Sequence, residues 1–596
     1  MEKGLNNKDI NKNNNFDTNQ IFFIQRWLEL LNTNTHSKYS VRYLNSHQAL
    51  KEVVYVCEGM LNGDIKCNDH HLKLVIDEAR SIVESDDLLK REAKTHHKII
   101  IRSLSSCPKA TQKPQMHSIV YQLGYVIRYL DTCYLEWIVK RIKVLLFESE
   151  SISNIKVKEL KEIDNLILIL VSELLGKGWS IVKLYELIKE NLLPQRDDSE
   201  KWEIFIKTIL SDPNDYICLF RFESPPSKGL QAKMLDFELD LLNGDTVLME
   251  YSDSKLISHI SSDREYLRVI VRVFDQHSAI NSAWLQVIQK IDILRFYGYV
   301  LPEINKTPIV LWPDGRQFTR NVNVSLVLNK KKYHAPETLL DKIRLQIKKS
   351  NSESINRKIK SLFEFNRISE ESLAPQSTFL NLWIALESFV QTKEKDGGID
   401  NVKMVVGATA SHNYIYSLVK NFLEDCNRCN LEILEEESGN SIRIGRLKVY
   451  EALPLLLDNS KKEGITTNCY NVNILLGYRY RQLSEILSEG KKASKVIELH
   501  KENVVRHLQR LYRVRNAIVH SAEVHYNINL FIKHLSDYIE ATMSVVLHRL
   551  EDHDFNTLEE VFPMVRDSVE STIEILKSSN DLEEEEYYNL LINGAF

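Results

Sequence analysis

The sequence has no apolar run as long as the roughly 18 residues that a membrane-spanning helix needs. One of its longest runs, 166–171, is closed by Ser172 and Glu173. Residues 1–20 are rich in Asn and Lys and have no apolar core, so we expect a disordered tail there and neither a signal peptide nor an anchor. These absences predict a protein with no membrane partner.

Cysteine is sparse, and its spacing shows no disulfide framework. The eight cysteines are Cys57, Cys67, Cys107, Cys133, Cys218, Cys426, Cys429 and Cys469. Scattered cysteines in a large chain indicate reduced thiols and a cytoplasmic protein. Cys426 and Cys429 have the spacing of half a zinc site, which Cys469 or His412 could complete. Because a second paired cluster is missing, we expect no metal ion, with zinc kept as an alternative.

Common catalytic motifs are also missing. The sequence contains no G-x4-G-K-[ST] loop, no H-E-x-x-H helix, no Gly-rich nucleotide loop and no paired-carboxylate nuclease pattern. We therefore expect no cofactor. The formal charge is −5, so any contact with nucleic acid must come from a local basic patch.

What is present is the composition of a globular protein of several domains. Of the 596 residues, 43% are hydrophobic and 27% are charged. Apolar residues recur at three- and four-residue spacing through most of the chain, which predicts a mainly α-helical protein with a small β-containing middle region. The predicted segments are a disordered tail (1–20), a helical amino-terminal domain (21–210), a mixed α/β middle domain (211–350), a carboxy-terminal helical domain (360–580) interrupted by a polar, acidic insertion (about 426–494), and an acidic tail (581–596).

Two patterns describe the middle domain in more detail. Apolar spacing over 266–297 predicts one long amphipathic helix. Residues 308–328 predict a β-hairpin, because Pro313-Asp-Gly315 is suited to a turn and apolar residues alternate from Val322 to Leu328.

A basic stretch between 330 and 360 has two interpretations. Solvated helix faces explain most runs of this kind. The alternative is a track for the RNA backbone that precedes the carboxy-terminal domain. The candidate RNA-binding residues are Lys330, Lys331, Lys332, Lys348 and Lys349.

The stretch Leu511-Tyr-Arg-Val-Arg-Asn-Ala-Ile-Val-His520 carries the candidate chemistry. On a helical wheel, Arg515 lies in the middle of an apolar stripe, and Asn516 and His520 share one edge of it at i and i+4 spacing. A guanidinium keeps its proton, and its unpaired burial is costly. Arg515 therefore needs a carboxylate partner, an anionic ligand, or both.

Glu387 is the candidate partner for that cation. It lies in the segment 378–391, which is apolar almost all round and should form a buried helix. A lone carboxylate is poorly placed there. An ion pair between Glu387 and Arg515 would compensate both charges and orient the guanidinium.

The Arg515-Asn516-x-x-x-His520 pattern resembles the R-x(4–6)-H motif of HEPN ribonucleases. Phe379-Leu-Asn-Leu-Trp-Ile-Ala-Leu-Glu-Ser-Phe389 is similar to the opening helix of the Apea-like HEPN group of bacterial antiphage defence proteins. The resemblance implies a carboxy-terminal HEPN helical bundle, a homodimer in which two motifs face each other, and a metal-independent endoribonuclease. It also implies an RNA substrate and an antiviral, abortive-infection toxin that upstream domains hold inactive until a phage-derived trigger arrives. The long helical start departs from the β-rich amino-terminal regions of many such proteins.

The chemistry of the three residues agrees with that implication. An imidazole titrates near neutral pH, so His520 could move protons to and from the 2′-hydroxyl and the leaving 5′-oxygen. Arg515 offers a planar fork for phosphate oxygens, and Asn516 could bind the phosphate or orient the imidazole. The single histidine of one copy favours a dimer, because the reaction needs both an acid and a base.

Other interpretations stay open. Arg515 could be an ion-pair anchor and His520 a helix cap, in a non-catalytic HEPN dimerisation or sensor module. An AMP-transferring toxin–antitoxin role is disfavoured, because its HEPN partner typically has R-x4-H-x-Y and position 522 here is Ala. We expect His507 and His525 at the surface, and Glu523 either solvated or close enough to tune His520.

Overall fold

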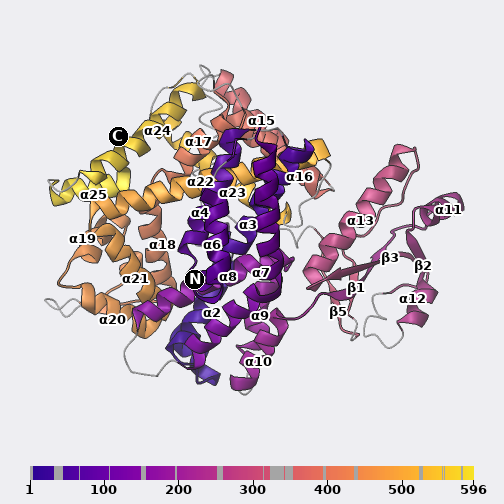
Figure 1. Ribbon diagram of the computed structural model, residues 1–596, viewed down its shortest axis with the longest axis horizontal. Coiled ribbons are helices and arrows are strands. Elements are labelled where there is room, and N and C mark those ends of the chain that lie inside the picture. Colours follow the sequence, from indigo (N-terminus) through magenta and orange to yellow (C-terminus); the bar gives the residue numbers. More distant parts are fainter. Residues whose placement is uncertain are drawn as a thin grey trace.

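The computed structural model is mainly helical, with a small antiparallel sheet in its middle region, which confirms the predicted fold class (Figure 1). None of its described helices is both long and apolar enough to span a membrane. The structure describes residues 5–32, 44–65, 68–105, 108–109, 111–148, 156–194, 198–251, 260–312, 315–322, 341, 353–372, 374–392, 398–434, 441–521, 528–552, 555, 557–578 and 582–595.

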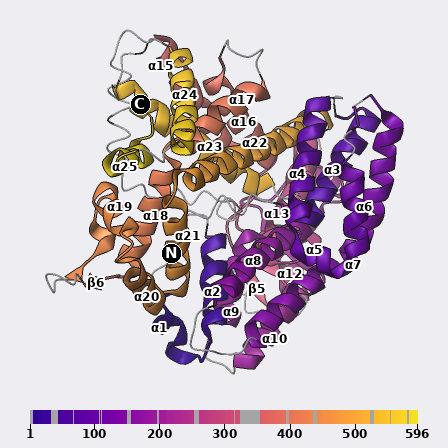
Figure 2. The same cartoon turned by 60° about the vertical axis from the view of Figure 1, so that its left-hand side comes forward.

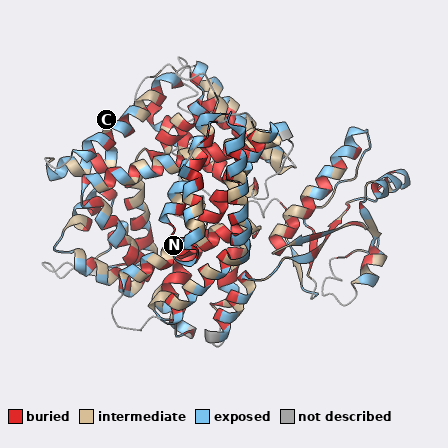
Figure 3. Ribbon diagram, viewed as in Figure 1, coloured by how far each residue is buried: buried red, intermediate tan, exposed pale blue. Residues whose placement is uncertain are grey.

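Long helices build the amino-terminal part of the chain, as the apolar spacing predicts. They are α2 (Thr18–Leu31), α3 (Ser46–Asn62), α4 (Asp69–Ser85), α5 (Asp87–Glu92), α6 (Lys94–Ser105), α7 (Lys113–Phe147), α8 (Val157–Lys177), α9 (Ile181–Asn191) and α10 (Asp198–Ile209). The helices α3, α4, α7 and α8 turn one apolar face inward and one polar face to solvent, which Figure 3 shows as red and pale blue sides, whereas α2 is buried all round from Ile21 to Leu31.

The segment predicted as a disordered tail is folded from Leu5 onward. It contains α1 (Asn7–Ile10) and a 3-10 turn, and its apolar side chains Leu5, Ile10 and Phe16 are buried. The Asn7 amide donates a 2.8 Å hydrogen bond to the carbonyl of Tyr470. A few apolar residues can fix a polar segment in one conformation when they pack against a distant part of the chain.

A five-stranded antiparallel sheet forms the middle domain, which lies beside the helical body in Figure 1. The strands follow the order β2-β3-β1-β4-β5 and comprise β1 (Asn214–Arg221), β2 (Asp240–Asn243), β3 (Glu265–Val273), β4 (Ile309–Leu311) and β5 (Gln317–Thr319). Its helices are α11 (Lys228–Asp236), α12 (Gly244–Glu250) and α13 (Gln276–Phe296), of which α13 packs on β3 and β1.

The predicted helix over 266–297 is wrong in its first third. Residues Glu265–Val273 form β3, which pairs with the whole length of β1, and the helix begins only at Gln276. The segment is rich in β-branched residues, which suit a pleated surface. Asp275 then caps α13 by accepting hydrogen bonds from the amides of His277 and Ser278 at 2.9 Å.

The predicted hairpin is present with shorter strands. β4 pairs with β5 from Ile309–Thr319 to Leu311–Gln317, and Gly315 adopts a positive φ of 79° in the turn. Val322 is buried but lies outside β5, and the alternating residues 323–328 lie outside the described residues.

The carboxy-terminal helical bundle has its own hydrophobic core. Its helices are α15 (Glu353–Glu371), α16 (Pro375–Val390), α17 (Ile399–Ser411), α22 (Gly490–Ser521), α23 (Ile528–Asp552) and α24 (Leu558–Lys577). α16 is buried along most of its length, as predicted, and Ile384 is its exposed apolar residue. The bundle begins with α15, a few residues before the predicted boundary at 360.

The predicted insertion is a helical unit that packs on the amino-terminal helices. It comprises α18 (Tyr414–Arg428), a short two-stranded ribbon (β6, Ile433–Leu434; β7, Ser441–Ile442), α19 (Val449–Leu457), α20 (Lys462–Val472) and α21 (Ile474–Leu487). These helices, the amino-terminal helices and α25 (Glu584–Asn593) share one hydrophobic core. The unit therefore begins at α18, before the predicted boundary at 426.

The predicted acidic tail contains both exposed and buried residues. Glu584, Glu585 and Glu586 are exposed, as a solvated end requires, but Leu590 and Leu591 of α25 are buried. The segment is thus part of the fold.

Buried charges join α21 to the amino-terminal helices. Arg479 pairs with Glu29 of α2 and with Asp425 of α18. Arg26 pairs with Glu29 at 2.7 Å and with Asp164 of α8 at 2.6 Å. The Glu29 side chain is 2% exposed, so these cations are what compensates its charge.

We predict that Arg479→Ala destabilises the protein by about 3 kcal/mol, because it leaves two buried carboxylates short of a cation. Urea unfolding followed by tryptophan fluorescence measures this. Arg481→Ala, an exposed neighbour on the same helix, is the control and should change the free energy of unfolding by less than about 0.5 kcal/mol. Equal effects of the two variants would contradict the role of the buried cluster.

Candidate functional site

The candidate site lies at the carboxy-terminal end of α22, a helix of 32 residues. Ala493 and Ile497 in its first part belong to the core shared with the amino-terminal helices, whereas Val504, Leu508 and Leu511 belong to the core of the carboxy-terminal bundle. Figure 2 shows α22 running from the region of α18 to α4. The helix therefore bridges two packing units.

Arg515, Asn516 and His520 occupy the last turns of α22. Arg515 and Asn516 are half-buried, and a guanidinium N–H of Arg515 donates a 3.1 Å hydrogen bond to the Asn516 side-chain carbonyl. His520 is exposed at the helix end, next to Val519, which is also exposed. Within the described part of the chain, Arg515 has no carboxylate partner. The cation is thus accessible and oriented by an uncharged neighbour.

The expected ion pair between Glu387 and Arg515 is not formed among the described residues. Glu387 is half-buried on α16 and accepts a 3.0 Å hydrogen bond from the indole N–H of Trp383, one turn earlier on the same helix. Arg515 and Glu387 are both half-buried. A helical wheel describes one helix at a time, so it does not show whether residues of two helices face each other. The local indole donor stabilises the carboxylate instead.

Two other arginines of α22 contact the amino-terminal domain. Arg510 donates 3.0 Å hydrogen bonds to Glu52 of α3 and to Glu78 of α4, and Arg513 also pairs with Glu52. All four side chains are nearly buried. The amino-terminal helices are therefore held against the helix that carries the candidate site, within two residues of Arg515.

The electrostatics of this contact favour the ionised form of Glu52. Burial alone would raise the pKa of its carboxyl group, but the charges of Arg510 and Arg513 outweigh burial and lower the pKa from 4.5 to about 2. The contact is consequently intact at neutral pH.

Aromatic contacts surround the same stretch of α22. The ring of Tyr512 lies 5.8 Å from Trp383 of α16 and 6.3 Å from His71 of α4, measured between centroids. Burial, followed by the charges of Lys403, His70 and Arg513, lowers the pKa of His71 to about 4. His71 is therefore a neutral packing residue at neutral pH.

The expectation of a surface position for His507 is wrong. The residue is 3% exposed, and its Nδ1 lies 3.1 Å from the hydroxyl of Tyr538 on α23. His507 falls on the buried side of α22, where the tyrosine hydroxyl satisfies it. His525 and Glu523, and the candidate RNA-binding residues Lys330, Lys331, Lys332, Lys348 and Lys349, lie outside the described residues.

The cysteine spacing does not assemble a metal centre in the described part of the chain, where no group of three or more His, Cys, Asp or Glu is placed to hold an ion. The side chains of Cys426, Cys429 and Cys469 are buried. Burial raises the pKa of all three, to about 11 for Cys429. Protonated thiols in an apolar environment act as packing residues.

Comparisons of the chain with protein-family models, with curated proteins and with solved structures found no match.

Sequence reasoning missed the contact between Arg510, Arg513, Glu52 and Glu78. The arginines lie on the same helix as the candidate site, but their partner Glu52 is 458 residues from Arg510. A helical face with several arginines is the one local signal, and it does not indicate which carboxylates will compensate them.

We predict that Glu52→Gln destabilises the contact between α22 and α3 by about 3 kcal/mol at pH 7, because Arg513 is left without its anion. The difference from the wild type should persist above pH 4.5 and shrink as the pH falls through about 2, where the wild-type carboxylate is protonated. Thermal unfolding across this pH range, and amide exchange of residues 505–521, measure it. Glu58→Gln, an exposed carboxylate on α3, is the control; an equal destabilisation in this variant would contradict the prediction.

Proposed function

We propose that this protein is a metal-independent endoribonuclease of HEPN type, which cleaves RNA through attack by the 2′-hydroxyl group. Arg515, Asn516 and His520 are the proposed catalytic residues. Glu387 is the proposed supporting residue, because it accepts the hydrogen bond of the Trp383 indole, which lies 5.8 Å from Tyr512 of the site helix.

One observation carries the proposal. The arginines of α22 that face the amino-terminal domain are neutralised by Glu52 and Glu78, and Arg506 pairs with Glu502 at 3.6 Å. Arg515 differs from them, because its hydrogen bond goes to the uncharged Asn516 and no described carboxylate pairs with it. A half-buried guanidinium of this kind is suited to a bound phosphate.

In the proposed reaction, imidazole groups transfer protons and the guanidinium stabilises negative charge. An imidazole takes the proton from the 2′-hydroxyl, whose oxygen then attacks the phosphorus, and the 5′-oxygen leaves with a proton from a second acid. The Arg515 guanidinium stabilises the charge that develops on the non-bridging oxygens. The products carry 2′,3′-cyclic phosphate and 5′-hydroxyl ends.

A homodimer supplies the second acid in this proposal. Each protomer contributes one exposed His520, and a two-fold interface would bring two such helix ends to one phosphodiester. The exposed Val519 next to His520 offers apolar area for that contact.

The amino-terminal helices are the proposed regulatory element. Their contact through Glu52 and Glu78 holds the segment next to the site in one position, so a trigger that separates them would change the mobility of the site helix. In this proposal the protein acts in the cytoplasm as a toxin of antiviral abortive infection, with a phage-derived trigger.

We predict that the purified protein cleaves single-stranded RNA in the presence of EDTA, and that His520→Ala or Arg515→Ala lowers the rate at least about 100-fold. Gel analysis and mapping of cyclic-phosphate ends measure this. His548→Ala and Arg506→Ala, which change the same residue types elsewhere, should keep wild-type rates.

Two results would overturn the nuclease proposal. Cleavage that survives both substitutions and stops in EDTA would indicate a metal-dependent site. A stable dimer that does not cleave RNA, even after the contact with the amino-terminal helices is broken, would favour a dimerisation or sensor module.

We also predict that the double variant Glu52→Gln/Glu78→Gln has a higher basal cleavage rate than the wild type. If the contact restrains the site, each 1.4 kcal/mol of restraint removed should raise the rate about tenfold. Adding His520→Ala to the double variant should abolish the increase. An unchanged rate, with amide exchange showing that α22 has become mobile, would exclude a restraining role for the amino-terminal helices.

A further inference from the structure

Tyrosine side chains form an exposed stripe on α7. Tyr121, Tyr125 and Tyr129 follow one another at one-turn intervals and are 74%, 55% and 36% exposed. Exposed aromatic rings that adjoin one another often mark a binding site, whereas single exposed rings are ordinary. The stripe lies on the outer edge of the molecule in Figure 2, where α6 and α7 are labelled.

Histidines extend the stripe into a set of nearly parallel rings. His96 of α6 stacks on Tyr129 with a centroid distance of 4.0 Å and an interplanar angle of 9°, and it lies 5.9 Å from Tyr125 at 22°. His117 lies 6.3 Å from Tyr121 at 23°. Planar rings already arranged with similar orientations need little reorganisation to receive another planar group.

The segment that carries these rings has charges of one sign. Residues 93–130 contain no Asp or Glu, although the whole chain has a formal charge of −5. All the cations of this segment are exposed, and none is paired with a carboxylate in the described part of the chain; they are Lys94, Lys98, Arg102, Lys109, Lys113 and Arg128. Exposed cations without a carboxylate partner can bind the phosphates of a polyanion.

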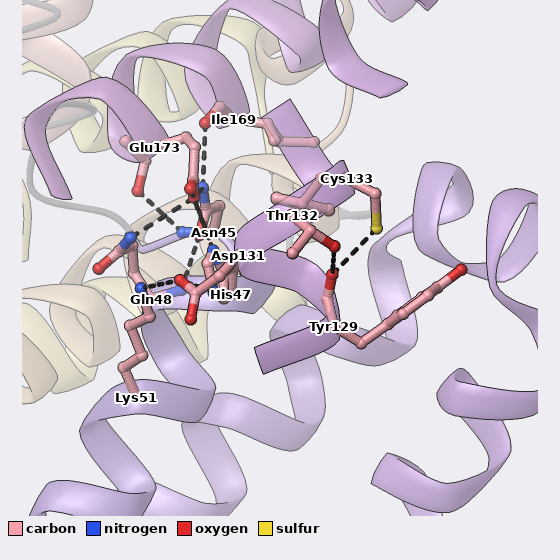
Figure 4. A network of polar contacts seen from close by, with 12 residues as sticks. Asn45, His47, Gln48, Lys51, Tyr129, Asp131, Thr132, Cys133, Ile169 and Glu173 are labelled. Carbon is pink, nitrogen blue, oxygen red and sulfur yellow. Dashed lines mark hydrogen bonds and ion pairs between the residues drawn. The ribbon is translucent and has the colours of Figure 1, made fainter. Parts of the chain in front are cut away.

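The network in Figure 4 fixes the position of the stripe. Asp131, which follows Leu130 on α7, pairs with Lys51 of α3 at 2.7 Å and lies 3.3 Å from His47 Nε2. The other ring nitrogen of His47 lies 3.0 Å from Glu173 of α8. Figure 4 shows the Tyr129 ring pointing away from these contacts. Asp131 is thus engaged with Lys51 and His47 of α3.

We propose that this α6–α7 surface, defined by His96, His117, the three tyrosines and the α7 cations Lys113 and Arg128, binds a single-stranded nucleic acid. Bases stack on the tyrosine and histidine rings, and the phosphates contact the lysines and arginines. A duplex fits less well, because its bases are already stacked on one another and do not present free faces.

The composition of the surface argues against a membrane as the partner. A membrane-binding face would present aliphatic or Phe and Trp side chains for burial in the acyl region. The large apolar side chains exposed on α6 and α7 between 94 and 130 are the three tyrosines, within the described residues. Stacking also has no preference for sugar type, so RNA and DNA strands are separate arms of the test.

The test measures binding without cleavage. The full-length protein is titrated into a labelled 15-nucleotide 2′-O-methyl RNA, which lacks the 2′-hydroxyl needed for cleavage, and fluorescence anisotropy reports the dissociation constant. Tyr121→Ala/Tyr125→Ala should weaken binding at least about tenfold, since a stacked base contributes on the order of 1–3 kcal/mol. Tyr125→Phe should retain wild-type affinity, because it keeps the ring.

Matched variants separate stacking from charge and from damage to the fold. Tyr450→Ala removes an exposed tyrosine of α19 and should leave binding unchanged. Lys113→Ala/Arg128→Ala should reduce the slope of log affinity against log salt by about 0.7 for each phosphate that is no longer neutralised. Unchanged thermal unfolding of the variants confirms their folding.

The proposal is overturned if the wild type does not bind the strand at low salt, or if Tyr450→Ala weakens binding as much as the double tyrosine variant. Tighter binding of a duplex of the same length would also overturn it, as would equal binding of phosphatidylserine vesicles with the same sensitivity to the tyrosines. A labelled single-stranded DNA shows whether the sugar matters. Because the probe cannot be cleaved, a protein that binds it but does not cut RNA would refute the nuclease proposal alone.

Discussion

The buried carboxylate of Glu52 is the ionic contact that joins the amino-terminal helices to the part of α22 next to the candidate site. It lies between Arg510 and Arg513, and its low pKa shows how strongly their charges act on it. Separating α3 from α22 would leave charged groups without partners in a nearly dry interface. The association of the amino-terminal helices with the site helix therefore depends on maintaining this ionic contact.

The helix α22 connects the core shared with the amino-terminal helices to the core of the carboxy-terminal bundle. Its first part packs in the core that also contains α2, α8, α21 and α25, and its second part packs in the bundle of α15, α16, α17 and α23. A long helix transmits displacement better than a loop, since its backbone hydrogen bonds keep it rigid. The exposed His520 lies at the end of this helix, which packs in both units.

The proposed nuclease site and the proposed nucleic-acid surface would bind nucleic acid through different interactions. At the site, one accessible cation and one imidazole act on a single phosphodiester. On the α6–α7 surface, several rings and cations act on successive nucleotides, which gives affinity and tolerance of sequence. The predicted basic track at Lys330–Lys332 and Lys348–Lys349 would add a third set of contacts, and those residues lie outside the described part of the chain.

The sequence by itself determined that most of the chain is helical, where the hairpin turns, and that Arg515, Asn516 and His520 share a helix end, because these features depend on spacing within a few residues. It misassigned 266–273, since the spacing of apolar residues there suits a helix as well as a strand and only the pairing with β1 distinguishes them. Tertiary structure alone decided the burial of His507, the indole partner of Glu387, and the pairing of Arg510 with a carboxylate 458 residues away. Such contacts depend on the relative rotation and position of helices, which the packing of the whole chain sets and no local pattern records.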